Sequence, residues 1–587
     1  MTMDVQSPCS VSAAFRRLRA EHPDLPVFTF LDHEGRDQST LTFAQLGDEA
    51  ERVAAELHAR GLGPGDRALL VYLETADFVV ALLGCLALGV IPVPVCPPNP
   101  FTLHHDLDAF TLLAESTGAR VALTNATFDR ARASMQDGHP WPLVHWLRTD
   151  RPTRPRRTTW YEPAELDEPA LLHYTSGSTG SPRGVVLSHR NLHHELAHNA
   201  VDLGLGLDTR AVSWLPHFHD LGLICFLLSA MSGNGRVYQL SPLTFLHRPT
   251  TWFDVLARVR ATHTAAPNFA YDLAVRKTTE QMRANWDLSA LRVVMTAAEQ
   301  VRPATVDAFL AAFAVSGLDR NAFYPAYGLA EHTVSVTMGG RGRLRVEKAA
   351  LDEGKVVQLE DDSDVRAVTY VACGRVTKQG ADVRIVDPRT RQPCGTGQVG
   401  EIWVDSPSKA LGYFGLPEET AECFEAVVAG EFGGRRYLRT GDLGFLHEEE
   451  LYLTGRYKDL IIVHGQNHYP QDIEDSVRGC HAAVRAGGVA AFAVTTGDNE
   501  PAAERLVLYV ELKGRRPGEA LVDEVVRAVR HAVYTDHRLA SHTVVVGLSG
   551  LVSKTTSGKI RRQACKEAFL SGSVHEAPYT VSVSALH

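Results

Sequence analysis

One segment of the sequence combines the residue types needed to bind a polyphosphate. Residues 174–184 contain glycines, hydroxyl residues and a cation, and they lie between two strand-like apolar runs. Glycines let backbone N–H groups approach an anion, and hydroxyls with a cation complete the phosphate cradle. It is not a Walker A loop, which requires the order G-x-x-x-x-G-K-[ST]. A Ser/Gly surface turn is the simpler alternative, but the ordered pattern of the whole run favours phosphate binding. The expected phosphate contacts come from Thr175, Ser176, Gly177, Ser178, Thr179, Gly180 and Arg183.

Further motifs follow this loop in a fixed order along most of the chain. Together they resemble the motifs of the adenylate-forming superfamily, which comprises acyl-CoA synthetases, peptide-synthetase adenylation domains and luciferases. The matching segments are residues 174–184, 214–220, 327–331, 437–442, 455–459 and 557–560. The number and order of these matches exclude coincidence.

The resemblance implies a role for each motif that its chemistry can support. An ionised Asp442 can accept from both ribose hydroxyls, and Glu331 can hold Mg²⁺, which binds through one or two carboxylates plus substrate phosphates. Tyr327 offers a flat face to adenine, and Arg456 can reach the ribose or phosphate. Taken singly, each charged residue would be interpreted as part of an ordinary ion pair. The implied catalytic residues are Lys559, Glu331 and Arg456, and the implied metal ligands are Glu331 and Thr179. The nucleotide site adds Ala298, Glu299, Tyr327, Gly328 and Asp442. The acyl site has His219, Asn268 and Phe269, and the hinge is Lys458.

Three segments point to one branch of the superfamily. Residues 266–273 and 459–474 are similar to segments typical of fatty acyl-AMP ligases, and the span 332–373 looks like the insertion of that branch. Such ligases pass the acyl group to the phosphopantetheine thiol of an acyl carrier protein and largely reject free coenzyme A. This chain has no Asp-Ser-Leu attachment site of its own, so we expect the carrier protein to act in trans.

The implied reaction joins a fatty carboxylate to ATP, giving acyl-AMP and pyrophosphate, before the transfer to the carrier. A fatty acid is already ionised at neutral pH, so no protein nucleophile or general base is needed. Catalysis is expected from in-line positioning and from cations near the developing phosphate charge. Two alternatives stay open at this point: an acyl-CoA synthetase, and a non-catalytic homologue that binds nucleotide or lipid.

The sequence departs from the family pattern at two places in the expected nucleotide site. Arg183 stands where the phosphate loop usually has lysine, so a planar fork replaces a mobile point charge. Ala297 stands where the branch usually has glycine, which adds a methyl group near adenine.

Residues 194–198 read H-E-L-A-H and satisfy the zinc metalloprotease pattern H-E-x-x-H. Two histidines at i and i+4 do lie on one side of a helix, so zinc is geometrically possible. Five-residue patterns recur by chance, however, and in the resembled family this helix is structural. We therefore interpret Glu195 as a helix-face carboxylate.

The elements that must position these residues alternate between helical and strand periods, which predicts an α/β fold. Residues 49–60 read as a helix and 68–73 as a buried strand. The apolar run 78–95 approaches the length of a membrane span. Glycines interrupt it and prolines end it, so a buried helix to about Gly89 followed by a core strand is favoured.

The predicted organisation is a large layered N-terminal domain over residues 1–457, a small mobile α+β lid over 458–571 and a frayed tail over 572–587. Residues 151–157 read as a solvated Pro- and Arg-rich linker, and 498–504 as a loop. A chain of 587 residues exceeds the size of a single hydrophobic core, which agrees with this division.

Composition restricts the partners and the compartment. A net charge of -10 provides no basic field for nucleic acid or anionic lipid. The 9 cysteines are dispersed, which predicts reduced thiols in a cytoplasmic protein. The first ten residues lack the pattern of a signal peptide. The expected partners are thus a fatty acid, ATP, Mg²⁺ and a carrier protein, with no membrane span, and the oligomeric state stays open.

Overall fold

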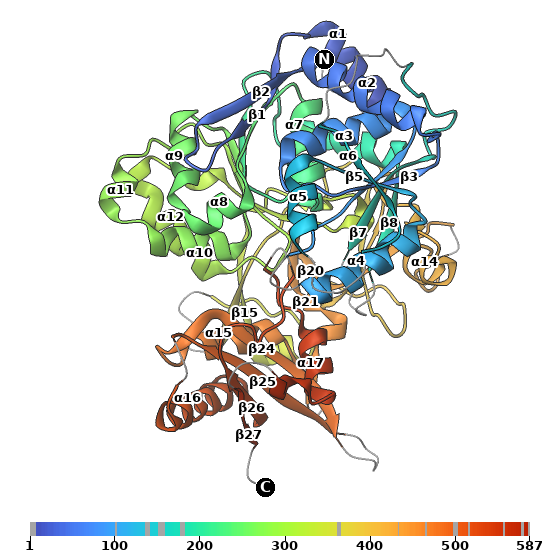
Figure 1. Ribbon diagram of the computed structural model, residues 1–587. Coiled ribbons are helices and arrows are strands. Elements are labelled where there is room, and N and C mark those ends of the chain that lie inside the picture. Colours follow the sequence, from blue (N-terminus) through green and yellow to red (C-terminus); the bar gives the residue numbers. More distant parts are fainter. Residues whose placement is uncertain are drawn as a thin grey trace.

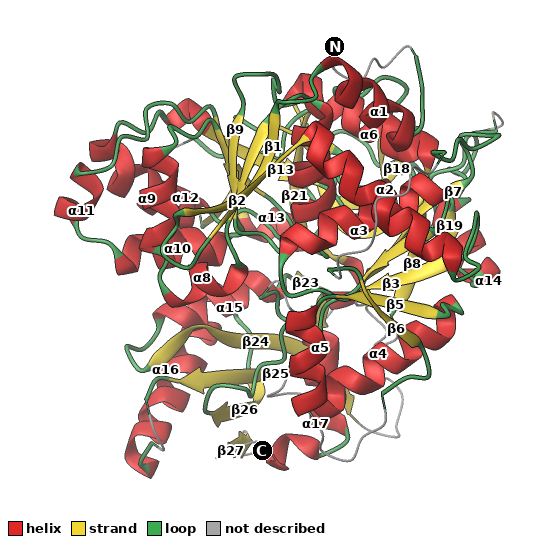
Figure 2. Cartoon of the chain, turned by 45° about the horizontal axis from the view of Figure 1, so that its top comes forward, coloured by secondary structure: helices red, strands yellow, loops and turns green. Residues whose placement is uncertain are grey.

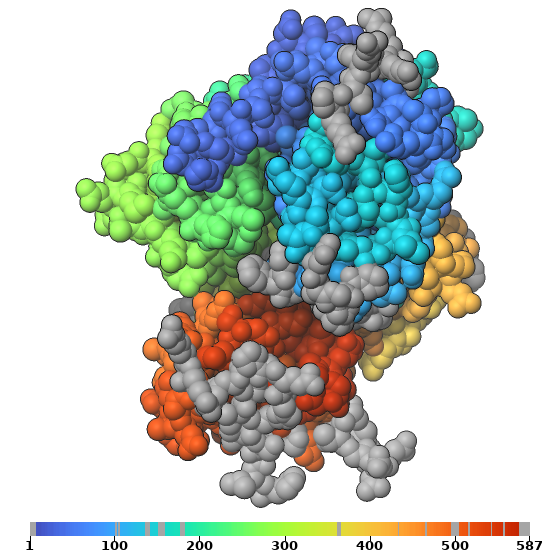
Figure 3. Space-filling view, viewed as in Figure 1, coloured from blue at the N-terminus to red at the C-terminus, as the bar shows by residue number. Residues whose placement is uncertain are grey.

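The computed structural model describes residues 7–99, 103–135, 141–150, 159–175, 182–360, 366–431, 434–463, 466–496, 503–514, 517–555, 558–576 and 580–584. About the first three-quarters of the chain form a large body. In Figure 1 this body sits above a smaller C-terminal domain. The space-filling view shows the same division between the two parts (Figure 3). The structure confirms the predicted α/β class with a large N-terminal and a small C-terminal domain.

The large body is built around a mixed sheet in which parallel neighbours predominate. Its strand order is β14-β13-β12-β11-β9-β10-β1-β2, with antiparallel pairs at the two edges. The strands are β1 (Pro26–Leu31), β2 (Asp37–Thr42), β9 (Arg210–Ser213), β10 (Arg236–Gln239), β11 (His263–Ala265), β12 (Val293–Thr296), β13 (Phe323–Tyr327) and β14 (Thr337–Met338). Because β12 and β13 run parallel, their carboxyl ends lie at the same edge, where the predicted Ala298 and Tyr327 follow.

A second, parallel sheet has the order β4-β3-β5-β6, and smaller antiparallel sheets complete the body (Figure 2). The parallel strands are β3 (Arg67–Leu70), β4 (Ile91–Pro94), β5 (Val121–Thr124) and β6 (His145–Arg148). The others are β7 (Pro169–Thr175), β8 (Arg183–Ser188), β15 (Arg343–Glu347), β16 (Ala367–Val371), β17 (Asp382–Val386), β18 (Gly400–Asp405), β19 (Gly412–Tyr413), β20 (Leu438–His447) and β21 (Glu450–Arg456).

Helices cover the faces of these sheets (Figure 2). They are α1 (Val11–Glu21), α2 (Phe43–Ala59), α3 (Thr75–Leu88), α4 (Leu103–Thr117), α5 (Ala126–Ser134), α6 (His189–Asp202), α7 (Ser229–Ser232), α8 (Pro242–His247), α9 (Thr250–Arg258), α10 (Asn268–Lys277), α11 (Glu280–Ala284), α12 (Pro303–Phe313), α13 (Lys348–Asp352) and α14 (Pro417–Phe424). The helix α2 starts earlier than predicted, because Thr42 and Gln45 form a capping box.

The apolar run 78–95 has the predicted structure. It forms α3, which ends at Gly89 with a φ of 75°, and then the buried strand β4. A left-handed residue is a common way to end a helix, and glycine adopts it without steric cost. Along the part of the chain that the structure describes, no helix combines the length and the apolar composition that a membrane crossing needs.

The C-terminal domain has a sheet and a hydrophobic core of its own. Its sheet has the order β24-β25-β26-β27, and a short hairpin, β22-β23, precedes it. Its elements are β22 (Ile461–Val463), β23 (Gln466–His468), α15 (Pro470–Gly479), β24 (Val484–Thr496), β25 (Ala503–Leu512), α16 (Glu519–His537), β26 (Ser541–Gly547), α17 (Arg562–Leu570) and β27 (Thr580–Ser584). A cluster of buried aliphatic side chains, from Ile461 to Val546, lies between the sheet and α15 with α16.

Two predictions for this domain need correction. The expected frayed tail contains β27, which pairs antiparallel with β26 from Thr543 opposite Ser584 to Gly547 opposite Thr580. Backbone pairing along a free sheet edge fixes this segment, and the short polar-apolar run gives little sequence signal for it. Glu504, expected in a loop, belongs to β25. The linker 151–157 and most of the loop 498–504 lie outside the described residues.

Candidate active site

The nucleotide end of the site forms where β13 ends beside the hairpin β20-β21. Asp442 lies opposite Arg456 in that hairpin. Its Oδ1 accepts from Nε of Arg456 at 3.0 Å and its Oδ2 accepts from the Tyr327 hydroxyl at 2.9 Å. Asp442 is only 5% exposed, whereas the side chain of Arg456 is 58% exposed. Burial and then the charge of Asp442 raise the pKa of Tyr327, so the phenol remains a donor.

Glu331 and Arg183 meet at the ring of Tyr413. The Tyr413 hydroxyl donates to Oε1 of Glu331 at 3.0 Å, and the guanidinium carbon of Arg183 lies 5.2 Å from the ring centroid. Burial raises the pKa of Glu331 above its ordinary value. Cys423, at the end of α14, is influenced by the charges of both Glu331 and Arg183, and burial raises the pKa of its thiol. The predicted metal ligand and the phosphate-loop cation therefore share one corner of the site.

The ends of the predicted phosphate loop are brought together by the hairpin β7-β8, in which Thr175 lies opposite Arg183. This pairing holds the two ends of the loop next to each other. The loop itself, including Ser176, Gly177, Ser178, Gly180 and the predicted metal ligand Thr179, lies outside the described residues.

The connection after β12 supplies Ala298 and Glu299. Ala298 has a φ of 76°, a region that an alanine occupies at a cost of about 1–2 kcal/mol. Oε1 of Glu299 accepts from the backbone N–H of Asn268 at 2.8 Å. The Asn268 amide donates to the Gln300 carbonyl at 2.8 Å, and its oxygen accepts from the Arg302 N–H at 3.1 Å. Asn268, which was predicted in the acyl site, thus joins the start of α10 to the connection after β12.

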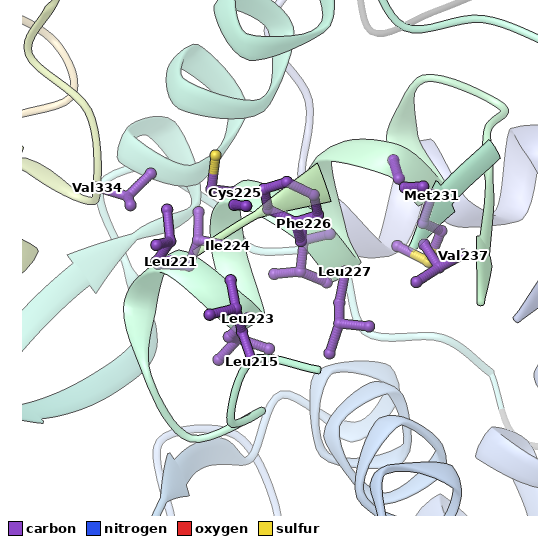
Figure 4. Packing of buried hydrophobic residues seen from close by; sticks show 14 of the residues in the cluster. Leu215, Leu221, Leu223, Ile224, Cys225, Phe226, Leu227, Met231, Val237 and Val334 are labelled. Carbon is purple, nitrogen blue, oxygen red and sulfur yellow. The ribbon is translucent and has the colours of Figure 1, made fainter. Parts of the chain in front are cut away.

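The acyl end of the site begins at His219 and continues into a buried helix. Nδ1 of His219 lies 2.6 Å from Oδ1 of Asp220. Asp220 caps a π-helix, Leu221–Leu228, in which every residue is buried. π-Helices are rare and occur frequently at functional sites. Figure 4 shows Leu221, Leu223, Ile224 and Leu227 of this helix packed among other apolar side chains. The sequence predicted only an apolar run here, because an ordinary core helix would have the same composition.

Phe269 lies in an aromatic wall next to this helix. Trp214 stacks on Phe245 with ring centroids 3.9 Å apart, and Phe269 stands edge-on to both rings at 6.2 Å and 6.4 Å. Gly558 of the C-terminal domain faces the Phe269 ring, since an added Cβ there would lie 3.4 Å from it. Gly558 also has a φ of 86°, so glycine is favoured on both grounds. The acyl wall and the lysine motif are thus in contact.

Lys559 lies between the two ends of the site. Its turn is closed by the Thr555 N–H donating to the Lys559 carbonyl at 2.8 Å and by the Lys559 N–H donating to Thr555 Oγ1 at 3.1 Å. Burial lowers the pKa of Lys559; the nearby carboxylate of Asp220 opposes this effect, and Arg456 adds to it. The charge of Asp442 also acts on the lysine. The charges of Asp220 and of Asp442 thus both act on one cation of the C-terminal domain.

Arg562 is a functional candidate that the sequence analysis did not single out. Its guanidinium donates to Oδ2 of Asp459 at 2.9 Å and to both oxygens of Glu474, at 2.7 Å and 2.8 Å. Asp459 follows the predicted hinge residue Lys458, which is exposed in the single turn Tyr457–Asp459. Arg562 thereby connects the base of the lysine turn to the hinge segment. The sequence signals Arg562 only as part of the short basic run that follows Lys559.

Comparison with known proteins shows the family. The AMP-binding enzymes match residues 15–414, and the family described as "Disco-interacting protein 2-like, AMP domain" matches residues 458–577. The chain belongs to the AMP-binding enzymes. Within that family it is an adenylate-forming enzyme close to the fatty acyl-AMP ligases.

Three relatives support this placement over nearly the whole chain. The medium-chain-fatty-acid–acyl-carrier-protein ligase JamA of Moorena producens (strain JHB) is 37% identical over 566 residues, covering 95% of each chain. The long-chain-fatty-acid–AMP ligase FadD26 of Mycobacterium marinum is 35% identical over 596 residues, covering 97% of this chain and 99% of the relative. A fatty acyl-adenylate ligase from L. pneumophila, solved in complex with acyl adenylate and pyrophosphate, is 33% identical with a TM-score of 0.73, covering 99% of this chain and 98% of that one.

Proposed function

We propose that this fatty acyl-AMP ligase activates a medium- or long-chain fatty acid with ATP and Mg²⁺, and then transfers the acyl group to the phosphopantetheine thiol of an acyl carrier protein in trans. The position of Lys559, between Asp220 at the acyl end and Asp442 at the nucleotide end, carries the proposal. A relative that joins a medium-chain acid to an acyl carrier protein supports the acceptor.

In the first half-reaction a carboxylate oxygen forms a bond to the α-phosphorus while the bond from that phosphorus to the β-phosphate bridging oxygen breaks. Pyrophosphate leaves with the electron pair, and no proton moves. Lys559 holds the carboxylate beside the phosphate and offsets the negative charge that develops at phosphorus. Asp442 accepts from the ribose hydroxyls, and Tyr327 and Arg456 fix the orientation of its carboxylate.

Glu331 provides the single carboxylate that Mg²⁺ commonly uses together with substrate phosphates, and Thr179 would complete the protein ligands. Bound Mg²⁺ would neutralise charge on the leaving phosphates. Arg183 lies at the same corner, where its guanidinium can bind phosphate oxygens through a planar fork.

Pyrophosphate release with a series of carboxylic acids tests the proposal. Medium- or long-chain fatty acids should drive release in the presence of Mg²⁺, and amino acids should not. Mass detection of the acyl adenylate confirms the product. Faster turnover with an amino or aryl acid than with every fatty acid would contradict the proposed substrate class.

The choice of acceptor is supported by contacts of the insertion-like span 332–373. Lys348, on α13 within this span, is 4% exposed; its ammonium bonds to Asp352 and lies 3.8 Å from Asp472 on α15. The span therefore contacts the C-terminal domain. We expect the intact enzyme to load holo carrier protein and leave coenzyme A unreacted. Trimming residues 341–364 should allow some acyl-CoA to form, and efficient acyl-CoA synthesis by the intact chain would contradict this assignment.

A further inference from the structure

The H-E-x-x-H segment of α6 contains a buried ion pair. Glu195 is 0% exposed, and its Oε2 accepts a hydrogen bond from the ammonium of Lys378, whose side chain is 1% exposed. The preceding His194 uses both ring nitrogens: Nε2 donates to the Gln379 carbonyl at 3.0 Å and Nδ1 accepts from the Ser408 hydroxyl at 2.7 Å. Protein partners therefore occupy the atoms that a zinc ion would need at His194.

Both members of the pair bind a single residue, Ser335. Oε1 of Glu195 accepts from the Ser335 backbone N–H at 3.0 Å and from its hydroxyl at 2.5 Å. The ammonium of Lys378 donates to the Ser335 carbonyl at 2.5 Å. Burial opposes the ionisation of Glu195, but Lys378 and His332 hold the pKa of this carboxyl below its ordinary value. The carboxylate is thus charged and binds the N–H of Ser335, while Lys378 binds its carbonyl, so the pair fixes the peptide groups on both sides of Ser335.

Ser335 lies directly behind the loop that carries the nucleotide motif. A Cβ added to Gly328 would lie 1.8 Å from the Val334 carbonyl oxygen and 2.8 Å from Cα of Ser335. The Val336 N–H donates to the Tyr327 carbonyl at 2.8 Å. The backbone of residues 334–336 therefore forms the back of the adenine motif, and its position sets the position of Tyr327. Val334 also packs in the same buried cluster as the π-helix of the acyl end (Figure 4).

The residues between Glu331 and Ser335 continue the same network. Nδ1 of His332 donates to the Ser335 carbonyl at 2.8 Å. Thr333 has a φ of 65°, which is unfavourable for a β-branched residue, and its hydroxyl donates to the Ser408 carbonyl at 2.6 Å. Strained residues persist only where the surroundings hold them. The buried pair is part of those surroundings, since it fixes the residue at which this short segment ends.

We propose that Glu195 and Lys378 are positioning residues for nucleotide recognition, which act by holding Ser335 behind Gly328 and Tyr327. They touch neither substrate nor metal. The proposal rests on the nucleotide site proposed above. It explains why charged residues are retained in a place where an apolar pair of similar size would often be as stable.

The test separates this role from a purely structural one. Glu195→Gln and Lys378→Met each leave one partner buried without its counterpart, whereas the double variant Glu195→Leu/Lys378→Met removes both charges. Three quantities are measured for each full-length variant: the thermal midpoint, the KM values for ATP and for the fatty acid from pyrophosphate release, and the rise of the thermal midpoint caused by AMP.

A matched control is Glu51→Gln. This carboxylate is also ion-paired, to Arg19 at 2.6 Å, and accepts from the Trp160 indole at 3.0 Å, but it lies among the N-terminal helices. It reports the general effect of neutralising a half-buried carboxylate. Asp442→Asn serves as a marker for the nucleotide site itself.

We expect the single variants to raise the KM for ATP about tenfold, as loss of supporting contacts behind a site typically does, with little change in the KM for the acid. The double variant should recover the thermal midpoint yet keep the raised KM for ATP and the weakened AMP-induced stabilisation. Recovery of ATP recognition together with the thermal midpoint would overturn the proposal, because the pair would then serve the fold alone. Equal increases in both KM values would overturn it as well. An unchanged KM for ATP in Asp442→Asn would instead refute the nucleotide site on which the proposal rests.

Discussion

The proposed role of Lys559 predicts different effects of its loss on the two half-reactions. In the proposed reaction the lysine lies beside both reacting groups, and a donor that stabilises developing charge typically contributes about 10²–10³ in rate. Lys559→Ala should therefore nearly abolish acyl-AMP formation and still transfer the acyl group from supplied acyl-AMP to holo carrier protein. Pyrophosphate release and acyl-carrier mass measure the two steps. Equal slowing of both steps would mean that the lysine supports the fold instead of the chemistry.

Gly328 is the residue where a single methyl group should have the largest effect on nucleotide recognition. The Cβ of an alanine would lie 1.8 Å from the Val334 carbonyl oxygen, which belongs to a backbone that the buried ion pair holds in place. Gly328→Ala should therefore displace the adenine motif and lower kcat/KM for ATP by about 10²-fold or more. Gly63→Ala is the control, because glycine there, like Gly328, does not have a left-handed φ, but an added Cβ meets no atom within 4 Å. Similar losses in both variants would indicate a general effect of replacing glycine and not a displaced adenine motif.

At the residue scale, the sequence predicted the members of the site better than their contacts. Tyr327 and Asp442 were predicted in the nucleotide site and Arg456 as a catalytic residue, and the structure brings Tyr327 and Arg456 each within hydrogen-bond distance of Asp442. Arg562 was not given a role. Its partners Asp459 and Glu474 lie far away along the chain, and a single sequence contains no signal for such pairings.

At the element scale, composition and turn residues predicted α3 and β4 correctly, since Gly89 marks the end of the helix. The π-helix Leu221–Leu228 could not be predicted, because an all-apolar run has no periodicity that distinguishes hydrogen-bond patterns. The strand β27 was also missed, since its stability comes from pairing with β26 and not from its own residues.

The contact between α13 and α15 predicts a pH dependence of stability. Burial raises the pKa of Asp472 to about 7, although Lys348 opposes the shift. The folded state therefore binds a proton between about pH 4 and pH 7 that the unfolded state has released, so this group lowers the free energy of unfolding as the pH rises through that range. Asp472→Asn should remove this loss of stability and raise the free energy of unfolding by about 1–3 kcal/mol at pH 8.

Chemical denaturation of wild type and Asp472→Asn at pH 4.5 and pH 8 measures this effect as the difference between the two proteins. Asp523→Asn, an exposed position on α16, is the control, and this variant should keep the pH dependence of the wild type. A variant that loses stability equally at both pH values would show that Asp472 is charged and paired in the folded protein.

For the whole molecule, separate hydrophobic cores predict that unfolding is not a single transition. The aliphatic cluster of the C-terminal domain is distinct from the large cluster of the body, and domains with their own cores unfold as separate cooperative units. Calorimetry of the full chain should resolve at least two transitions. A non-hydrolysable acyl-adenylate analogue should bring them together, because it would contact Lys559 of one domain and Asp442 of the other. One two-state transition in the ligand-free protein would contradict this prediction.

The division into a large N-terminal and a small C-terminal domain was the part of the whole-molecule organisation that the sequence predicted. The hinge at Lys458 stays a prediction, and a stiffening variant addresses it. Lys458→Pro should impair transfer to the carrier protein more than adenylation, because the domain must turn between the two steps. Equal effects on both half-reactions would place the pivot elsewhere.

The thiol of Cys423 has a consequence for the fate of the product. An acyl adenylate is a mixed anhydride, and a cysteine thiolate close to it would become acylated. Such acylation would inactivate the enzyme. Cys423 lies within reach of the charges of Glu331 and Arg183, yet burial raises its pKa, so at neutral pH it stays a poorly nucleophilic thiol. Intact-protein mass spectrometry after many turnovers without carrier protein should find Cys423 unmodified. The ligase would then be chemically inert at this thiol toward its own activated intermediate, and the acyl group would remain available to a thiol that arrives from outside.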